Sequence, residues 1–219
     1  MIWAQARYYV HYFTRYLRLR CIFAPAMMTP QVKKIRQTDL SAYNNTPFHP
    51  GGTAVKRILW FYFNALFFKT SLLPSNGFKV FLLRAFGAKI GKGVLIRRSA
   101  TVTYPWKLTI GNWCWVGDHA TLYTLGEITI DENTVISHHA YLCTASHDYT
   151  RPTFDQFAKA IHVESEAWIA TNVFVGPGVT IGRGAVVGAC SVVLKDVPAN
   201  IVCAGNPLKV LRTRVTETE

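Results

Sequence analysis

Aliphatic residues recur at every sixth position through more than half of this chain, separated by small and polar residues. Four places after each of them stands a residue that is small or of valine size, with Trp106 as the exception. A fixed six-residue period is typical of a parallel β-helix, in which three hexapeptides form one triangular turn and the aliphatic side chains point to its axis. The repeating residues are Ile90, Ile96, Val102, Ile110, Val116, Leu122, Ile130, Ile136, Leu142, Val163, Ile169, Val175, Ile181, Val187 and Val193.

Glycine directly follows six of the fifteen aliphatic residues, in a chain with 15 Gly among 219 residues. Glycine adopts a positive φ without steric cost. We therefore expect glycine or asparagine to take the strained backbone at the corners of each turn.

Extra residues interrupt the period at one corner of the predicted β-helix. Two follow Val102, two follow Leu122 and fifteen follow Leu142, always between the third face of one turn and the first face of the next. Insertions on one side of a solenoid usually mark its binding side. The long insertion, which opens at Thr144 and runs to about Ala160, is therefore the main candidate for a functional loop.

The segment before the repeat has helical rather than hexapeptide spacing. Residues 55–69 are apolar nearly all round, and residues 78–86 are amphipathic with Lys79 and Arg84 on the polar side. Two interpretations stay open: a cap on the open end of the solenoid, or an interfacial patch that rests on the inner face of the membrane.

The chain carries a net charge of +12, and positions 1–38 contain seven Lys or Arg and no acidic residue. No nucleic-acid-binding module accompanies this charge, so we expect no nucleic-acid partner. The five cysteines are odd in number, and Cys114 and Cys190 occupy repeat slots for small apolar residues, which favours a reducing, cytoplasmic location over a disulfide framework. Met27 and Met28 precede a sequence typical of a cytosolic start, so residues 1–27 are a candidate non-native extension.

Several motifs carry a family resemblance that covers roughly residues 40–217. The repeat, the TASHD sequence from Thr144 to Asp148, VVLKDVPAN from Val192 and AGNPLKV from Ala204 resemble the hexapeptide-repeat O-acetyltransferases. The stretch from Phe81 onward is more similar still to the colanic acid biosynthesis acetyltransferases. The resemblance implies a left-handed β-helix, a homotrimer, acetyl-CoA as co-substrate and an acceptor that is a sugar or a lipid-linked oligosaccharide.

The same resemblance assigns roles to individual residues. His147 occupies the place of the general base that removes the proton of the acceptor hydroxyl, a role that suits imidazole near neutral pH. Asp118 and Asp148 are candidates for acceptor binding, although Asp148 could equally cap its loop. For the coenzyme, Trp168 would flank the pantetheine arm and a backbone N–H at Ala170 or Thr171 would serve the thioester oxygen. The cations Lys195, Lys209 and Arg212 would meet the phosphates.

Two other functions remain open at this stage. His119 and His139 occupy the same slot in successive turns, with Asp118 and His138 beside them, so the strand spacing of about 4.8 Å predicts stacked rings. Such a ladder could belong to a metal hydratase like γ-class carbonic anhydrase, but three convergent ligands are not evident and we expect no metal. A non-catalytic β-helix scaffold is the second alternative.

The expected organisation is mainly β, in four parts. Residues 1–38 form a basic N-terminal extension and residues 39–88 a helical region. Residues 89–204 form the left-handed β-helix acyltransferase domain with a loop at 147–160, and residues 205–219 form a C-terminal tail.

Overall fold

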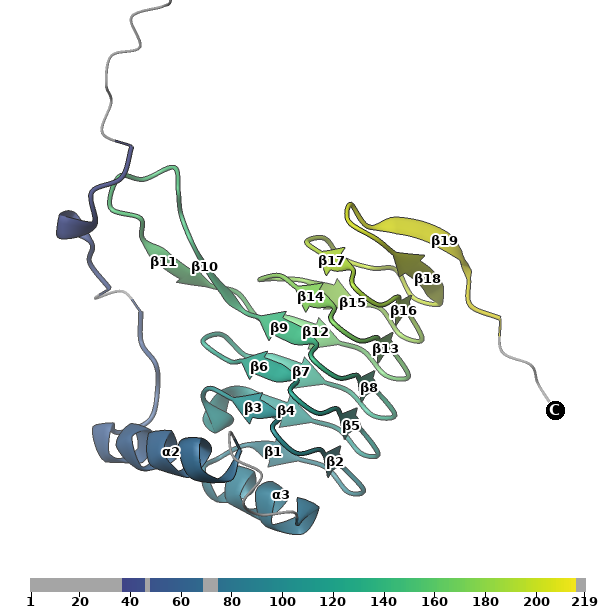
Figure 1. Cartoon of the computed structure of the whole chain (residues 1–219), viewed down its shortest axis with the longest axis horizontal. Helices are drawn as coiled ribbons and strands as arrows, with labels where there is room; N and C mark the ends of the chain where they lie inside the picture. The colour runs from purple at the N-terminus through teal and green to yellow at the C-terminus, as the bar shows by residue number, and fades with distance from the viewer. Residues whose placement is uncertain (1–36, 46–47, 69–74, 216–219) are drawn as a thin grey trace, which may run out of the picture. The chain divides into compact units, whose positions relative to one another are not determined.

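The computed structural model describes residues 37–45, 48–68 and 75–215. From Thr38 onward the chain forms a left-handed parallel β-helix with two α-helices at its N-terminal end (Figure 1). The predicted fold class is confirmed. The basic segment 1–38, including residues 1–27, lies outside the described residues except for its last two.

Each turn of the β-helix contributes one strand to each of three parallel sheets. Sheet A contains β1 (Lys89–Ile90), β4 (Leu108–Ile110), β7 (Ile128–Ile130), β12 (Ile161–Val163) and β15 (Thr180–Ile181). Sheet B contains β2 (Leu95–Ile96), β5 (Trp115–Val116), β8 (Val135–Ile136), β13 (Trp168–Ile169), β16 (Val186–Val187), β18 (Ile201–Ala204) and the antiparallel β19 (Lys209–Thr213). Sheet C contains β3 (Thr101–Val102), β6 (Thr121–Tyr123), β9 (Tyr141–Cys143), β14 (Phe174–Val175) and β17 (Val192–Val193).

The core follows the predicted period, and every repeating aliphatic residue is buried along the axis. The predicted position of the small residue is wrong in three repeats. Trp106, Gly126 and Ser146 lie in the corner insertions and outside the buried core. Each insertion shifts the register, so that a large residue at the start of the next sheet A strand is buried instead. These residues are Leu108, Ile128 and Ile161.

The expectation of Gly or Asn in the strained corner backbone holds in part. Positive φ occurs three places after the aliphatic residue, at Gly93, Gly178, Gly184, Asn133 and Asn172 but also at His119 (58°) and His139 (55°), and not at the glycine that follows the aliphatic residue directly. That glycine is needed for close approach instead, since a Cβ on Gly117 would lie 2.6 Å from the His138 backbone nitrogen in the next turn. Cys190 also occupies a positive-φ corner and is exposed, so its predicted packing role is wrong.

Helices α2 (Ala54–Phe67) and α3 (Asn76–Ala85) cover the first turn of the β-helix (Figure 1). Both begin at side-chain N-caps, where Thr53 accepts from the Lys56 N–H and Ser75 accepts from the Phe78 N–H. Trp60, Leu82 and Leu83 on their inner faces, and Phe68 directly after α2, join the hydrophobic core. The cap interpretation therefore holds for the inner faces of both helices.

Lys79 is buried and does not lie on a polar face as predicted. Its Nζ donates to the Arg97 carbonyl at 3.0 Å and lies 5.5 Å from the Phe68 ring centroid. Burial lowers the pKa of this ammonium group. A lysine of α3 thus fastens the cap to the corner between β2 and β3. None of the helices in the described ranges is both long and apolar enough to cross a bilayer.

Candidate active site

The long insertion folds into an antiparallel hairpin of β10 (Ala145–His147) and β11 (Gln156–Ala158). It leaves the β-helix after β9 of sheet C and returns to β12 of sheet A (Figure 1). The hairpin therefore stands at the corner between sheets C and A, which is the corner opposite sheet B.

His147 ends the first strand of this hairpin and is held by Phe154. Its Nδ1 lies 2.9 Å from the Phe154 carbonyl oxygen, and the two rings stack with centroids 4.5 Å apart and planes 7° from parallel. Phe154 has a φ of 53°, which turns its carbonyl and ring to the same neighbour. Because a carbonyl oxygen can only accept, Nδ1 carries the proton, and in the neutral ring Nε2 keeps a free lone pair.

Asp148 shapes the hairpin turn. Its Oδ1 accepts from the Thr150 backbone N–H at 3.0 Å, and its Oδ2 lies 3.5 Å from the Arg151 guanidinium. Hydrogen bonds from Thr150 hold the pKa of this carboxyl below its usual range. The loop-capping role is thus present, and the carboxylate also lines the cleft described next.

A cleft of about 730 Å³ lies between the hairpin and the N-terminal segment 37–45. The Asp39 N–H donates to the Pro152 carbonyl at 2.6 Å, and the Tyr43 ring lies 6.1 Å from the His147 ring. Sequence reasoning missed this cleft because nothing in the pattern relates residues 37–45 to a hairpin a hundred positions later. Most of its lining residues are of polar or charged type: Ala42, Asn44, Asp148, Arg151, Thr153, Asp155, Gln156, Phe157 and Lys159.

Asp118 and the histidine ladder lie at corners of the β-helix next to sheet B. Asp118 pairs with Arg97, with Oδ2 to Nε at 3.4 Å. His119 and His139 stack with centroids 4.8 Å apart and planes 9° from parallel, so the predicted ladder is confirmed. Among the residues that the structure describes, no group of three His, Cys, Asp or Glu side chains could hold a metal ion.

The predicted coenzyme residues fall on two surfaces. Trp168 and Arg212 share one outer row of sheet B, through the register Trp168, Val186, Val202, Arg212. Three strand spacings separate them, roughly 14 Å. The Trp168 indole is half-exposed and donates to the Ser137 hydroxyl at 2.9 Å, which fixes its ring on this face.

One predicted donor is already engaged. The Ala170 N–H donates to the Val187 carbonyl at 2.9 Å within the ladder between turns, so Ala170 cannot also bind a thioester oxygen through this group. Within the described part of the chain, the Thr171 N–H has no such acceptor, which leaves Thr171 as the candidate.

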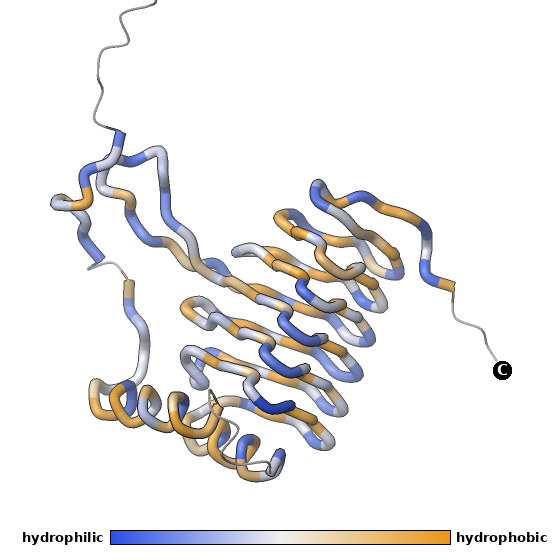
Figure 2. The backbone as a smooth tube through the Cα atoms, viewed as in Figure 1, coloured by the Kyte–Doolittle hydropathy of each residue, from blue (hydrophilic) through white to orange (hydrophobic). Residues whose placement is uncertain are grey.

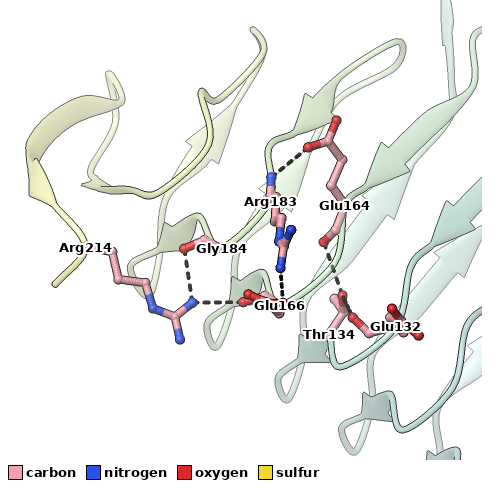
Figure 3. Close-up of polar contacts among 7 residues, drawn as sticks. All are labelled: Glu132, Thr134, Glu164, Glu166, Arg183, Gly184 and Arg214. Carbon is pink, nitrogen blue, oxygen red and sulfur yellow. Dashed lines mark hydrogen bonds and ion pairs between the residues drawn. The ribbon is translucent and has the colours of Figure 1, made fainter. Parts of the chain in front are cut away.

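The remaining cations lie at the C-terminal end of the β-helix. Lys195 borders a cleft of about 400 Å³ with Leu194, Asn206 and Val210, whereas Lys209 lies on β19 opposite Ala204. The tail that carries Lys209 and Arg212 is anchored by Arg214, whose guanidinium donates to the carbonyls of Glu166 at 2.8 Å and Gly184 at 3.0 Å (Figure 3).

Comparison with known proteins identifies the family. The bacterial transferase hexapeptide model (six repeats) matches residues 160–195. The "Putative colanic acid biosynthesis acetyltransferase WcaF" of Escherichia coli (strain K12) is 53% identical over 181 residues, which cover 83% of this chain and 99% of that protein. The chain belongs to the hexapeptide-repeat acetyltransferases. The resemblance inferred from the sequence motifs is therefore confirmed.

Two solved acetyltransferase structures extend the comparison, the first of a hexapeptide-repeat acetyltransferase. VCA0836 from Vibrio cholerae O1 biovar eltor, complexed with acetyl coenzyme A, superposes with a TM-score of 0.68 at 25% identity, over 77% of this chain and 94% of that one. A galactoside acetyltransferase in complex with coenzyme A gives 0.66 at 28% identity, over 73% and 80%. This chain is accordingly an enzyme, an O-acetyltransferase that uses acetyl-CoA as its co-substrate.

Proposed function

We propose that this acetyltransferase moves the acetyl group of acetyl-CoA to a sugar hydroxyl of a colanic acid-like exopolysaccharide precursor, with His147 as general base. The observation that carries the proposal is the hydrogen bond between His147 Nδ1 and the Phe154 carbonyl, because it leaves Nε2 as the acceptor of a proton. The name of the Escherichia coli relative supports the class of acceptor.

The transfer is direct. The acceptor hydroxyl attacks the thioester carbonyl while His147 Nε2 takes its proton, and a C–O bond forms. The tetrahedral intermediate then collapses, the C–S bond breaks, and the imidazolium returns the proton to the leaving thiolate as CoA-SH is released. In this scheme the Thr171 N–H stabilises the oxyanion, and no enzyme group is acetylated.

The hairpin cleft suits a sugar acceptor. Carboxylate, amide and guanidinium groups line it together, and the stacked rings of His147 and Phe154 stand on the same hairpin. Asp148 would bind hydroxyl groups through the carboxylate oxygens, whereas Asp118 is a weaker candidate because Arg97 already pairs with it. A screen of acetyl-CoA consumption with nucleotide sugars and lipid-linked oligosaccharides tests this assignment, and we expect turnover with the lipid-linked class.

A homotrimer would complete the site. Within one chain His147 stands at the corner opposite sheet B, while Trp168 lies on the face of sheet B, so a neighbouring subunit must bring the two together. The outward-facing side chains of sheets A and B support this packing. Those of sheet A are polar: Lys89, Thr109, Thr129, His162 and Thr180. The outer row of sheet B is apolar: Leu95, Trp115, Val135, Trp168 and Val186.

We therefore expect light scattering to give three times the chain mass at micromolar concentration. In a trimer Trp115→Glu would place three charges in the row of sheet B that is buried between subunits. The variant should dissociate and lose its activity. The matched change Thr129→Glu, on the polar row of sheet A, should alter neither. An active monomer would contradict this assembly.

The coenzyme would run along sheet B from Trp168 to the tail cations. Arg212→Ala or Lys209→Ala should raise the KM for acetyl-CoA by about 10- to 100-fold, because charge-assisted hydrogen bonds to phosphate contribute roughly 1.5–3 kcal/mol. The acceptor KM should stay nearly unchanged, and Lys92→Ala, in the first turn, serves as the control. A change in the acceptor KM alone would place the coenzyme elsewhere; Lys195 is tested in the same way.

We place the enzyme in the cytoplasm. The described cysteines Cys114, Cys143, Cys190 and Cys203 are free thiols, which suits a reducing compartment. Alkylation of these thiols in protein from unlysed cells, without prior reduction, tests the placement.

A further inference from the structure

The outer face of α2 is apolar and exposed to solvent. Val55, Ile58, Leu59 and Tyr62 recur at helical spacing, and between 47% and 66% of each is exposed. Trp60 points the opposite way into the core. The hydrophobic colouring along α2 is plain in Figure 2. A contiguous apolar face of this kind on a folded protein usually marks an interaction surface.

Charge is distributed unequally along the same solenoid. Residues 40–117 contain ten Lys or Arg and no acidic residue, whereas residues 118–219 contain seven basic and eleven acidic residues. Because a solenoid sets out its sequence in order along its axis, the helical cap and first turn form a basic end without acidic residues. The acidic residues lie mainly between Asp118 and Glu166, in the middle turns and the hairpin. The basic end is also the end that carries the outer face of α2 (Figure 1).

Basic side chains lie exposed on α3 and the first turn, at the same end of the β-helix. They include Arg84 at the end of α3, Lys89 and Lys92 around β1, and Arg97 and Arg98 after β2. Aromatic and aliphatic residues that insert at a bilayer surface, together with lysine and arginine beside them, are typical of interfacial helices on anionic lipid. A second copy of the same end would bring like charges together, so a self-contact through this face is disfavoured.

We propose that the α2 end of the β-helix docks on an anionic bilayer surface. Val55, Ile58, Leu59 and Tyr62 enter the boundary between headgroups and acyl chains, and the basic side chains of α3 and the first turn lie over the headgroups. At 14 residues, α2 is short and lies in the plane of the interface. This inference does not depend on the proposed acceptor, although a lipid-linked acceptor would be presented at the same surface.

Vesicle flotation of the full chain tests the proposal. We expect it to float with phosphatidylcholine vesicles that contain phosphatidylglycerol, to float less without that anionic lipid, and to lose binding as salt rises. Ile58→Glu/Tyr62→Glu should lower the partition coefficient about tenfold or more, because two apolar insertions are replaced by two anions.

A matched variant tests whether the effect depends on where the apolar side chains are replaced. Leu211→Glu/Val215→Glu replaces two similarly exposed apolar side chains in the C-terminal tail, at the far end of the β-helix from α2, and should float like wild type. Thermal melting should be unchanged in both variants, since all four side chains are solvent-exposed. Wild-type protein that does not float, or α2 variants that float normally, would overturn the proposal. A change of mass in sedimentation velocity for the α2 variant would also overturn it and would make this face a subunit contact.

Discussion

Replacement of His147 by alanine is expected to lower kcat by about 10²- to 10⁴-fold, the usual contribution of a positioned general base. The affinity for acetyl-CoA should barely change, because proton removal matters in the transition state and not in coenzyme binding. Stability should also hold, since His147 ends a hairpin outside the hydrophobic core. Steady-state kinetics with coenzyme titration and thermal melting provide the measurements.

The histidine ladder supplies matched controls. His138→Ala and His139→Ala remove the same kind of side chain from a corner of the β-helix and should leave most of the activity. A His147→Ala enzyme that keeps more than about a tenth of wild-type kcat would remove the general-base role, because even the smallest typical contribution would be missing.

Truncation of Ile161 to alanine is expected to cost about 2–5 kcal/mol of unfolding free energy. Ile161 is fully buried in the first sheet A strand after the hairpin, paired with Ile128, so its loss opens a cavity that the rigid turns cannot close. The melting temperature should fall by roughly 5–15 °C. Phe157→Ala, a larger truncation on the exposed strand β11, should lower it much less.

The Ile161 experiment also separates two registers for the repeat. Counting four residues from Leu142 puts the small slot at Ser146, which is exposed, while the structure puts Ile161 in the buried stack. If Ile161→Ala melts like wild type, the register through the insertion is not the one described.

Periodic features could be predicted from the sequence because each depends on local spacing. The aliphatic stack, the single corner that takes every insertion and the stacked pair His119 and His139 all follow from a six-residue count. The position of His147 in the long insertion, together with the family motif, predicted it as the general base.

Features that depend on contacts distant in the sequence could not be predicted. The six-residue spacing does not predict that Lys79 turns inward to the Arg97 carbonyl, or that Gly117 faces the backbone of the next turn. The polar cleft beside His147 needs residues 37–45 to return to the hairpin, and the hydrogen bond to Phe154 needs an unusual φ within the loop. The apolar outer face of α2 was visible as composition, but only the packing of Trp60 shows which side is left uncovered.

The most direct test of the central claim follows the acetyl group itself. Wild-type and His147→Ala proteins are incubated with acetyl-CoA labelled in the acetyl group and a lipid-linked exopolysaccharide precursor, and the label is located after separation. The account predicts label on the glycan as an alkali-labile ester, one free CoA-SH for each ester formed, and almost none with His147→Ala. Label bound to the protein, or equal transfer by both proteins, would contradict direct transfer with His147 as the base.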